Sequence, residues 1–366
     1  MLGGQNATPK RRLVPLAGAS RFPYTCLAMA RILKFLSGRK MTKNERVAAA
    51  LKGDHVDTVP VSAWWHDFER EWSAADLAAA TLEAYRKYDW DFIKVNPRAS
   101  YFGEAFGAKY APREGRQPDL IEPGISSAEH LPRIERQDGR SGAWAEQLEA
   151  LRLIAAGLDD EAPFMQTIFS PLATMSRITG STKYVQRLMK ENPDELLATL
   201  QPIAETLAAY SKASLDAGAA GVFFATVEWG SADVISMEDY NRFARPFDLK
   251  VLEAVQGAPF NVLHVCRTNN HLSRLLDYPV IAAFHWAVHQ QGNPSLSEIA
   301  AKTNRAVMGG VSQEETMTSG PPQGVSREAH AAIDETKGLR FFLAPGCSID
   351  PMTPEANLRA LVKAAR

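Results

Sequence analysis

The sequence predicts a single α/β domain, a (β/α)8 TIM barrel, over residues 41–366. From residue 59 onward, eight short apolar runs alternate with helical patterns. Eight strand–helix units are the number that closes this barrel, and strands that alternate with helices pair in parallel. An open, doubly wound sheet is the alternative. No G-x-G-x-x-G motif follows the first apolar run, so the commonest dinucleotide-binding form of the open, doubly wound sheet is not indicated.

The eight predicted strands share a short apolar run followed by helical sequence. They cover 59–65, 91–96, 164–170, 221–226, 260–265, 280–286, 305–310 and 339–345. Helices are predicted over 73–88, within 171–217, over 235–255, over 272–277 and from residue 354 to the end. Ser73, Ser236 and Thr353 are suitable N-caps, and Pro354 suits a first helical position. The charged, Pro/Gly-rich segment 97–163 is interpreted as an excursion with its own helices.

The composition limits the classes of partner. The chain has 366 residues, is 45% hydrophobic and 23% charged, and carries a net charge of −1. A chain with this net charge has no strong positive electrostatic field to attract nucleic acid or an anionic membrane, so neither partner is expected. Three cysteines argue against a disulfide framework and favour a reducing, cytoplasmic location.

Residues 1–40 differ from the rest of the chain because they are basic and contain no Asp or Glu. They are consistent with a targeting segment. The alternative, which we favour, is a disordered or misassigned leader, because "MTKNERVAAALKG" at Met41 resembles a natural start. Cys26 lies in this leader and is left out of the predicted chemistry.

In a barrel of this kind, active-site residues lie where the strands end. That rule selects chemically useful side chains after seven of the predicted strands. The candidates for substrate binding are Trp64, Trp65, His66, Asn96, Arg98, Ser170 and His285. The aromatic cluster around Trp64 and Trp65 could line a pocket or pack at the barrel mouth. Glu228 could be a metal ligand, a general base or a substrate clamp, or simply a solvated carboxylate.

His264, Cys266 and Cys347 form a candidate metal site. The first two are spaced i, i+2 at a strand end, which puts both side chains on one face, and Cys347 follows the last strand. Zinc binds imidazole nitrogen and thiolate sulfur, and three protein ligands leave a fourth position open, as in catalytic sites. The alternative is that the cysteines are ordinary buried thiols and the histidine a satisfied residue at the barrel rim.

Four segments resemble the uroporphyrinogen decarboxylase superfamily. They are "MTKNERVAAALKGDHVDTVPV", "EWGSADVISMEDYNRFARPF", "FNVLHVCRTNNHLSRLLDY" and "FFLAPGCSIDPMTPEANLRALVKAA". The resemblance covers roughly 41–366 and implies one barrel. True decarboxylases carry R-Q-A-G-R after strand one and an aspartate after strand two, where this chain has "SAWWHDF" and "VNPRAS". At the position after strand eight where the decarboxylases have a histidine, this chain has Cys347.

The other branch of that superfamily holds zinc-dependent, corrinoid-linked methyltransferases, whose ligands are H-x-C and a distant G-C. His264, Cys266 and Cys347 fall on that pattern. Arg267 departs from it, because the family often has glycine there; this cation could narrow the pocket or pair with an anionic substrate.

The resemblance implies a zinc enzyme that moves a methyl group between a corrinoid and a small thiol or related acceptor. This chain lacks the corrinoid-binding D-x-H-x-x-G motif, so the corrinoid is expected to be free or on a partner protein, and a homodimer is possible. Two alternatives stay open. One is a carboxy-lyase for a porphyrinogen or small carboxylate, anchored by Arg98 or Arg267. The other is a ligand-binding barrel without catalysis.

Overall fold

The computed structural model describes residues 3–4 and 40–366. Within that range, Met41–Arg366 form one compact unit. The predicted leader, and Cys26 with it, lies outside the described residues apart from residues 3, 4 and 40. None of the helices in the described chain is long and apolar enough to cross a membrane.

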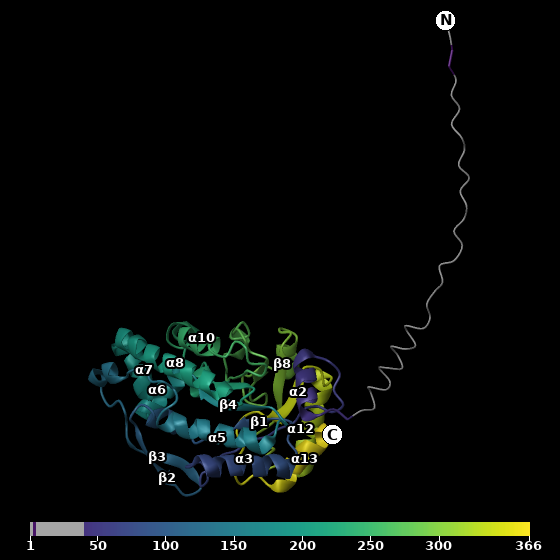
Figure 1. Ribbon diagram of the computed structural model, residues 1–366, viewed down its shortest axis with the longest axis horizontal. Coiled ribbons are helices and arrows are strands. Elements are labelled where there is room, and N and C mark those ends of the chain that lie inside the picture. The colour runs from purple at the N-terminus through teal and green to yellow at the C-terminus, as the bar shows by residue number, and fades with distance from the viewer. Residues whose placement is uncertain (1–2, 5–39) are drawn as a thin grey trace. The chain divides into compact units, whose positions relative to one another are not determined.

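A parallel sheet of seven strands curls through this unit (Figure 1). All six strand pairings are parallel, as the alternating pattern predicts. In the order of pairing, the strands are β1 (Ile93–Val95), β4 (Phe164–Phe169), β5 (Gly221–Ala225), β6 (Val262–His264), β7 (Ala283–His285), β8 (Ala306–Val311) and β9 (Phe341–Pro345). Seven of the eight predicted strands are therefore confirmed.

The predicted first strand, 59–65, is not a regular strand. It forms two isolated parallel bridges, Val61 with Leu343 and Trp65 with Ile349. The carbonyl of Val61 also accepts a hydrogen bond of 2.9 Å from the backbone of Asp91, just before β1. Pro60 has no N–H to donate, which limits regular pairing here. The segment is thus hydrogen-bonded both to β9 and to the residue that leads into β1.

The helices and 3₁₀ turns occupy the connections between strands, and α3 packs on β1 while α8 packs on β4 (Figure 1). The α-helices are α2 (Lys43–Lys52), α3 (Ala74–Tyr88), α4 (Tyr101–Glu104), α5 (Ala143–Leu158), α6 (Pro171–Thr179), α7 (Thr182–Glu191), α8 (Pro193–Asp216), α9 (Met237–Phe243), α10 (Arg245–Glu253), α11 (Leu296–Ala300), α12 (Pro322–Thr336) and α13 (Glu355–Ala365). The 3₁₀ turns are η1 (Ala128–Arg133), η2 (Val227–Gly230) and η3 (Leu272–Arg274).

The predicted helix starts are confirmed at two of three places. The side chains of Ser73 and Ser236 each accept a hydrogen bond from the third backbone N–H that follows. The predicted start of the last helix is wrong by one residue, because Pro354 is the N-cap and α13 begins at Glu355. The long helix predicted over 235–255 is two helices, since Pro246 lacks the N–H that would continue the first.

The excursion 97–163 contains an antiparallel hairpin that the sequence did not reveal, β2 (Lys109–Arg113) and β3 (Arg116–Glu122). Leu120 of the hairpin packs on Gly180, where an added Cβ would lie 2.0 Å from a leucine methyl carbon. Gly180 also has φ 69°, a left-handed conformation that favours glycine. The hydroxyl of Tyr110 donates to the carbonyl of Arg177 at 2.6 Å, so the hairpin is held against α6.

Aromatic rings fill the interior at the amino ends of the strands. Phe92, Phe260 and Phe342 pack against one another with ring centroids 5.4–5.6 Å apart. All three are buried and belong to a core cluster inside the curl of the sheet. Because one end is filled, space for a ligand is left at the carboxyl end of the strands.

The buried carboxylate of Asp91 joins three distant parts of the chain. Its oxygens accept from Arg46 of α2 at 2.6 Å, from Arg366 at 2.8 Å and from the backbone N–H of Val61 at 2.9 Å. The Asp91 side chain is fully buried and that of Arg46 nearly so. This ion pair therefore holds the irregular first segment beside β1.

We expect Asp91→Ala to lower the free energy of unfolding by about 3–5 kcal/mol, because it leaves the buried Arg46 without one of its two carboxylate partners. Urea denaturation followed by circular dichroism measures this. The matched control is Asp119→Ala, which removes an exposed ion pair to Arg113 and should cost about 0–1 kcal/mol. Equal effects of the two substitutions would contradict the role given to Asp91.

Candidate metal centre

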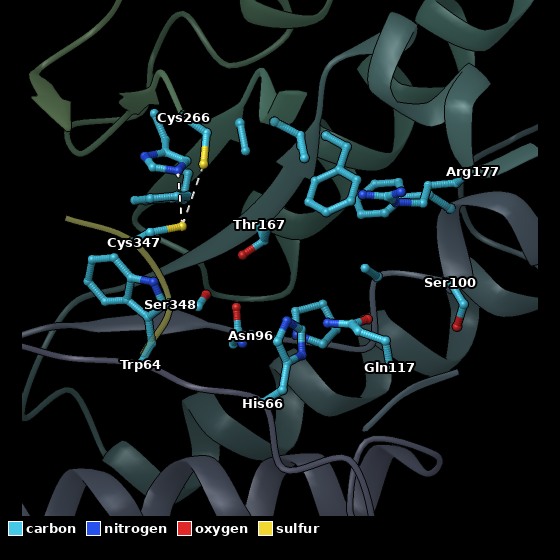
Figure 2. Close-up of a pocket in the computed structure, with 18 of the residues that line it drawn as sticks. Trp64, His66, Asn96, Ser100, Gln117, Thr167, Arg177, Cys266, Cys347 and Ser348 are labelled. Atoms are coloured by element: carbon cyan, nitrogen blue, oxygen red, sulfur yellow. Dashed lines mark hydrogen bonds between the residues drawn. The ribbon is translucent and has the colours of Figure 1, made fainter. Parts of the chain in front are cut away.

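A cavity of about 590 Å³ opens at the carboxyl end of the strands. Its walls come from residues that follow β1, β4, β5, β6 and β9, and from the β2–β3 hairpin. Figure 2 shows the sulfurs of Cys266 and Cys347 at one end of this cavity and Arg177 and Ser100 toward the other. The volume is typical of sites for small molecules.

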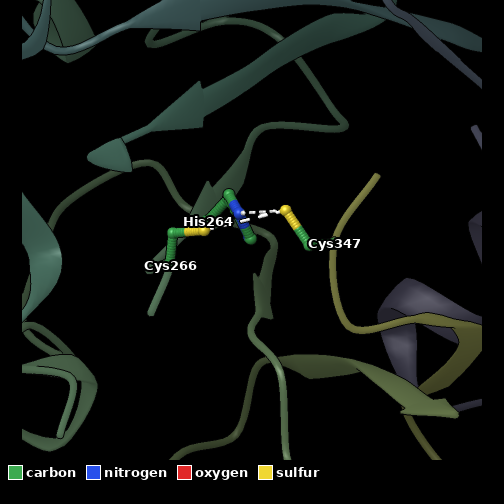
Figure 3. A group of neighbouring side chains, drawn as sticks. All are labelled: His264, Cys266 and Cys347. Carbon is green, nitrogen blue, oxygen red and sulfur yellow. Dashed lines mark hydrogen bonds between the residues drawn. The ribbon is translucent and has the colours of Figure 1, made fainter. Parts of the chain in front are cut away.

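The three predicted metal ligands lie together (Figure 3). His264 is the last residue of β6, Cys266 follows it, and Cys347 comes from the loop after β9. The two sulfurs are 3.7 Å apart, and the Cys347 sulfur is 3.6 Å from Nε2 of His264. All the ligand atoms lie within 4.8 Å of one another. The parallel sheet thus brings residues 81 positions apart to one point.

Two of the three separations between the ligand atoms fit a tetrahedral zinc site. With Zn–S of about 2.3 Å and Zn–N of about 2.0–2.1 Å, tetrahedral geometry separates two sulfurs by about 3.8 Å. A sulfur and a nitrogen are then about 3.6 Å apart. The observed separations of 3.7 and 3.6 Å agree with both values. The soft donor set, two sulfurs and an imidazole, also suits zinc.

A second histidine fixes the orientation of the first. His264 and His285 are partners in the register of β6 and β7, and their Nδ1 atoms are 2.8 Å apart. Nε2 of His285 lies 2.9 Å from the carbonyl oxygen of Pro345. A carbonyl only accepts, so we assign the proton of His285 to Nε2, and its Nδ1 then accepts from His264. That leaves Nε2 of His264 unprotonated and facing the cysteines, as a metal ligand requires.

The buried surroundings keep His285 neutral. Burial lowers the pKa of His285 well below its usual value, and the neighbouring His264 and Lys94 act in the same direction.

The two cysteines influence each other's pKa. The hydrogen bond between their side chains holds the pKa of the Cys347 thiol well below its ordinary value. The same contact raises the pKa of Cys266. A stabilised thiolate in this position is suited to bind a metal.

Four of the residues predicted to bind substrate line the cavity. They are Trp64, His66, Asn96 and Arg267. The Nδ2 atom of Asn96 is buried without a hydrogen-bond partner, so a ligand or water could use this donor.

The other predicted residues lie outside the lining, and their roles in catalysis or binding stay predictions. Arg98 is buried in ion pairs with Glu104 and Glu146. Ser170 caps α6 through the N–H of Ala173.

Trp65 lines a second, smaller cavity. His285 acts on the ligand His264 instead of facing the ligand space. Glu228 accepts from Thr182 at 2.9 Å and lies 3.8 Å from the guanidinium of Arg177. In the described chain, the compact group of possible metal ligands at this site does not include Glu228.

Several lining residues were not found by sequence reasoning. Tyr110, Gln117 and Leu120 reach the cavity from the unpredicted hairpin, and Arg177 reaches it from α6. No spacing rule points to them, because their approach depends on how the hairpin packs on α6.

Lys94 is the missed residue for which the sequence held a signal, because this lysine stands between apolar residues in the run "DFIKVN". It is 7% exposed, and its amine donates to Oδ1 of Asn96. The same amine lies 5.2 Å from the ring centroid of Phe223 and 5.8 Å from that of Trp64. Burial lowers the pKa of Lys94 to about 7.

The backbone conformation at Arg267 explains why glycine, which the resembling family often has after the H-x-C motif, suits this position. Arg267 has φ 72°, in the left-handed region that glycine enters at no steric cost. An arginine in this position carries some backbone strain, and its side chain lines the cavity beside Cys266.

Comparison with known proteins identifies the class. The model of the family Uroporphyrinogen decarboxylase (URO-D) matches residues 42–366. The chain therefore belongs to the uroporphyrinogen decarboxylase family, as its sequence motifs predicted.

Two curated relatives match over nearly their whole length. A methylcobamide:CoM methyltransferase MtbA of Methanosarcina acetivorans is 23% identical over 343 residues, which cover 89% of this chain and 98% of the relative. A methylcobamide:CoM methyltransferase MtaA of Methanosarcina barkeri is 26% identical over 348 residues, with the same coverage. A uroporphyrinogen decarboxylase of Escherichia coli is 27% identical, but over 58% of this chain and 65% of its own.

Among solved structures, a methyltransferase from Methanosarcina mazei has the same fold, with a TM-score of 0.74 and 23% identity. It covers 89% of this chain and 98% of its own chain. The comparisons agree with the predicted placement of this enzyme in the methyltransferase branch.

We expect the purified protein to carry about one metal ion per chain, and Cys266→Ser or Cys347→Ser to lose most of it, because a hydroxyl is a far poorer ligand than a thiolate. Inductively coupled plasma mass spectrometry measures this. The matched control is Cys26→Ser, which removes a thiol outside the ligand set. Full metal occupancy in the Cys266→Ser/Cys347→Ser double variant would contradict the site.

Proposed function

We propose that this protein is a zinc-dependent methyltransferase that moves a methyl group between a corrinoid and a small thiol. The observation that carries the proposal is the cluster of His264, Cys266 and Cys347, in which two of the three ligand separations fit zinc. Support also comes from relatives named methylcobamide:CoM methyltransferases, which match this chain from end to end of their own sequences.

His264, Cys266 and Cys347 would hold the zinc and leave a position open toward the cavity. A zinc ion there would lower the pKa of a coordinating thiol, so that the acceptor is a thiolate at neutral pH. The protein's own contribution is orientation. The hydrogen bond from His264 to His285 fixes the imidazole, and the aromatic walls formed by Trp64 and Phe223 exclude water from the reacting sulfur.

The charges around the cavity favour an anionic acceptor. The permanent cations Arg177 and Arg267 line it, whereas Glu314 is the single carboxylate among the described lining residues. Nε of Arg177 is buried without a partner, and its ion pair with Glu228 is loose at 3.8 Å. An acceptor with its sulfur at the metal and an anionic group at Arg177 would use both ends of the cavity. Glu228 would then position Arg177.

The methyl donor is proposed to be a corrinoid that is free or carried by a partner protein. The cavity, at about 590 Å³, is of a size for the acceptor and the reacting face of the donor. In this proposal the segment 59–65 serves as the irregular first strand of a closed eight-stranded barrel.

The proposal is tested by incubating zinc-loaded protein with methylcobalamin and a panel of small thiols. We expect loss of the methylcobalamin spectrum and formation of the methyl thioether, detected by mass spectrometry. The rate should fall about 100-fold or more in Cys347→Ser, because the thiol is no longer activated. Transfer that survives removal of the metal by a chelator, or decarboxylation without transfer, would refute the proposal.

We expect Arg177→Gln to raise KM about 10- to 100-fold for thiols with a sulfonate or carboxylate, because one charge-assisted hydrogen bond contributes about 1.5–3 kcal/mol. KM for uncharged 2-mercaptoethanol should change little. Steady-state kinetics with both kinds of thiol measure this. Arg187→Gln, on the exposed surface of α7, is the matched control. An equal rise in KM for charged and uncharged thiols would contradict anion binding by Arg177.

A further inference from the structure

Lys94 lies in the wall between two cavities. The second cavity, of about 250 Å³, shares Trp64, Lys94 and Asn96 with the main cavity. Its remaining lining includes the buried carboxylate of Glu71 and exposed parts of α3. The side chain of Lys94 therefore borders both cavities.

We propose that Lys94 accepts the proton of the substrate thiol in the main cavity and returns it to solvent through the second cavity. This inference rests on the function proposed above and assigns the protein group that receives the thiol proton. In the described structure, no hydrogen bond joins Lys94 to any of the three metal ligands; its amine contacts Asn96 and two aromatic rings.

Charge balance in the buried site supports this role. Two thiolate ligands offset the two positive charges of a zinc ion, so the site is neutral before the thiol binds. Binding the thiol as a thiolate adds one negative charge, which is costly in a region of low dielectric unless a positive charge appears nearby. A lysine that becomes protonated in the same event keeps the net charge of the site unchanged.

The surroundings of Lys94 leave it able to change its protonation state. Burial is the main cause that brings its pKa to about 7, while Cys347, Glu71 and Cys266 favour the charged form. His285 also faces this amine, and burial keeps that imidazole neutral. Lys94 lies over the faces of Trp64 and Phe223, which can stabilise the ammonium form.

The second cavity provides an exit for the proton. Four buried polar atoms of residues at this cavity have no hydrogen-bond partner: Oγ of Ser62, Oε2 of Glu71, Nε1 of Trp90 and Nδ2 of Asn96. Polar atoms of this kind in a roomy cavity are the usual partners of water. Oε1 of Glu71 lies 2.8 Å from Nδ1 of His66, which itself lines the main cavity.

In the proposed reaction, each bond that breaks is matched by one that forms. The S–H bond of the thiol breaks, the proton forms a bond to Nζ of Lys94, and the sulfur keeps the electron pair. That sulfur then bonds to the methyl carbon, and the corrinoid keeps the electron pair of its broken bond to carbon. The product is a neutral thioether, so Lys94 releases its proton to solvent and the site returns to its starting charge.

Proton counting by isothermal titration calorimetry tests this. Zinc-loaded protein is titrated with 2-mercaptoethanol at about pH 7.5, below the pKa of an ordinary thiol, about 8.5, in buffers of different ionisation enthalpy. The wild-type protein should release less than roughly half a proton per thiol, because the negative charge of the bound thiolate raises the pKa of Lys94 from about 7 to above the working pH, so that Nζ retains the proton. Lys94→Met should release about one.

Lys94→Gln is a second variant with a neutral side chain, and Lys109→Met on the exposed hairpin is the matched control. Metal content and thermal unfolding are measured for each, so that a folding defect is recognised. Equal proton counts in wild type and both Lys94 variants would overturn the role of Lys94 while leaving the proposed function intact. Failure of the wild type to bind any thiol would refute the proposed function and this inference together.

Discussion

The hydrogen bond between His264 and His285 is the contact on which the candidate metal centre depends. It exists because β6 and β7 pair in parallel with these two residues as register partners. A slip of one residue in either strand would turn the histidine of that strand to the other face of the sheet and break this contact. The carbonyl of Pro345 at the end of β9 completes the chain of contacts, so three strand ends together determine which nitrogen of His264 faces the cysteines.

Much of the fold and the grouping of the three candidate metal ligands could be predicted from sequence, because both follow rules of spacing. Short apolar runs marked seven strands, and the rule that side chains gather at the carboxyl ends of parallel strands brought Cys347 to His264 and Cys266. The segment 59–65, predicted as the first strand, is not a regular strand, because Pro60 has no N–H for regular pairing. The buried carboxylate of Asp91 holds this segment through a hydrogen bond to the backbone of Val61.

The rest of the cavity could not be predicted, because it depends on packing between segments with no fixed spacing. The β2–β3 hairpin lies in a charged excursion without an apolar pattern, yet Leu120 fits over Gly180 and brings Gln117 to the cavity. Arg98 follows a strand as the rule requires, but two glutamates bind it. Position at a strand end is therefore not sufficient for a role in the cavity, and Arg177 of α6 shows that it is not required. The neighbours of each side chain decide whether it faces the cavity.

The cavity brings together two kinds of group whose combination narrows its chemistry. Cations alone would suit a carboxy-lyase, since Lys94, Arg177 and Arg267 could each hold a carboxylate. Two sulfurs 3.7 Å apart beside an imidazole have no part in such a reaction, and desolvating thiolates without a metal would be costly. A thiol acceptor uses both features, because its sulfur needs the soft-ligand cluster and an anionic tail needs the cations. The same reasoning explains why a lysine of variable charge is useful at this wall, where a permanently charged arginine would leave the resting site with an unbalanced positive charge.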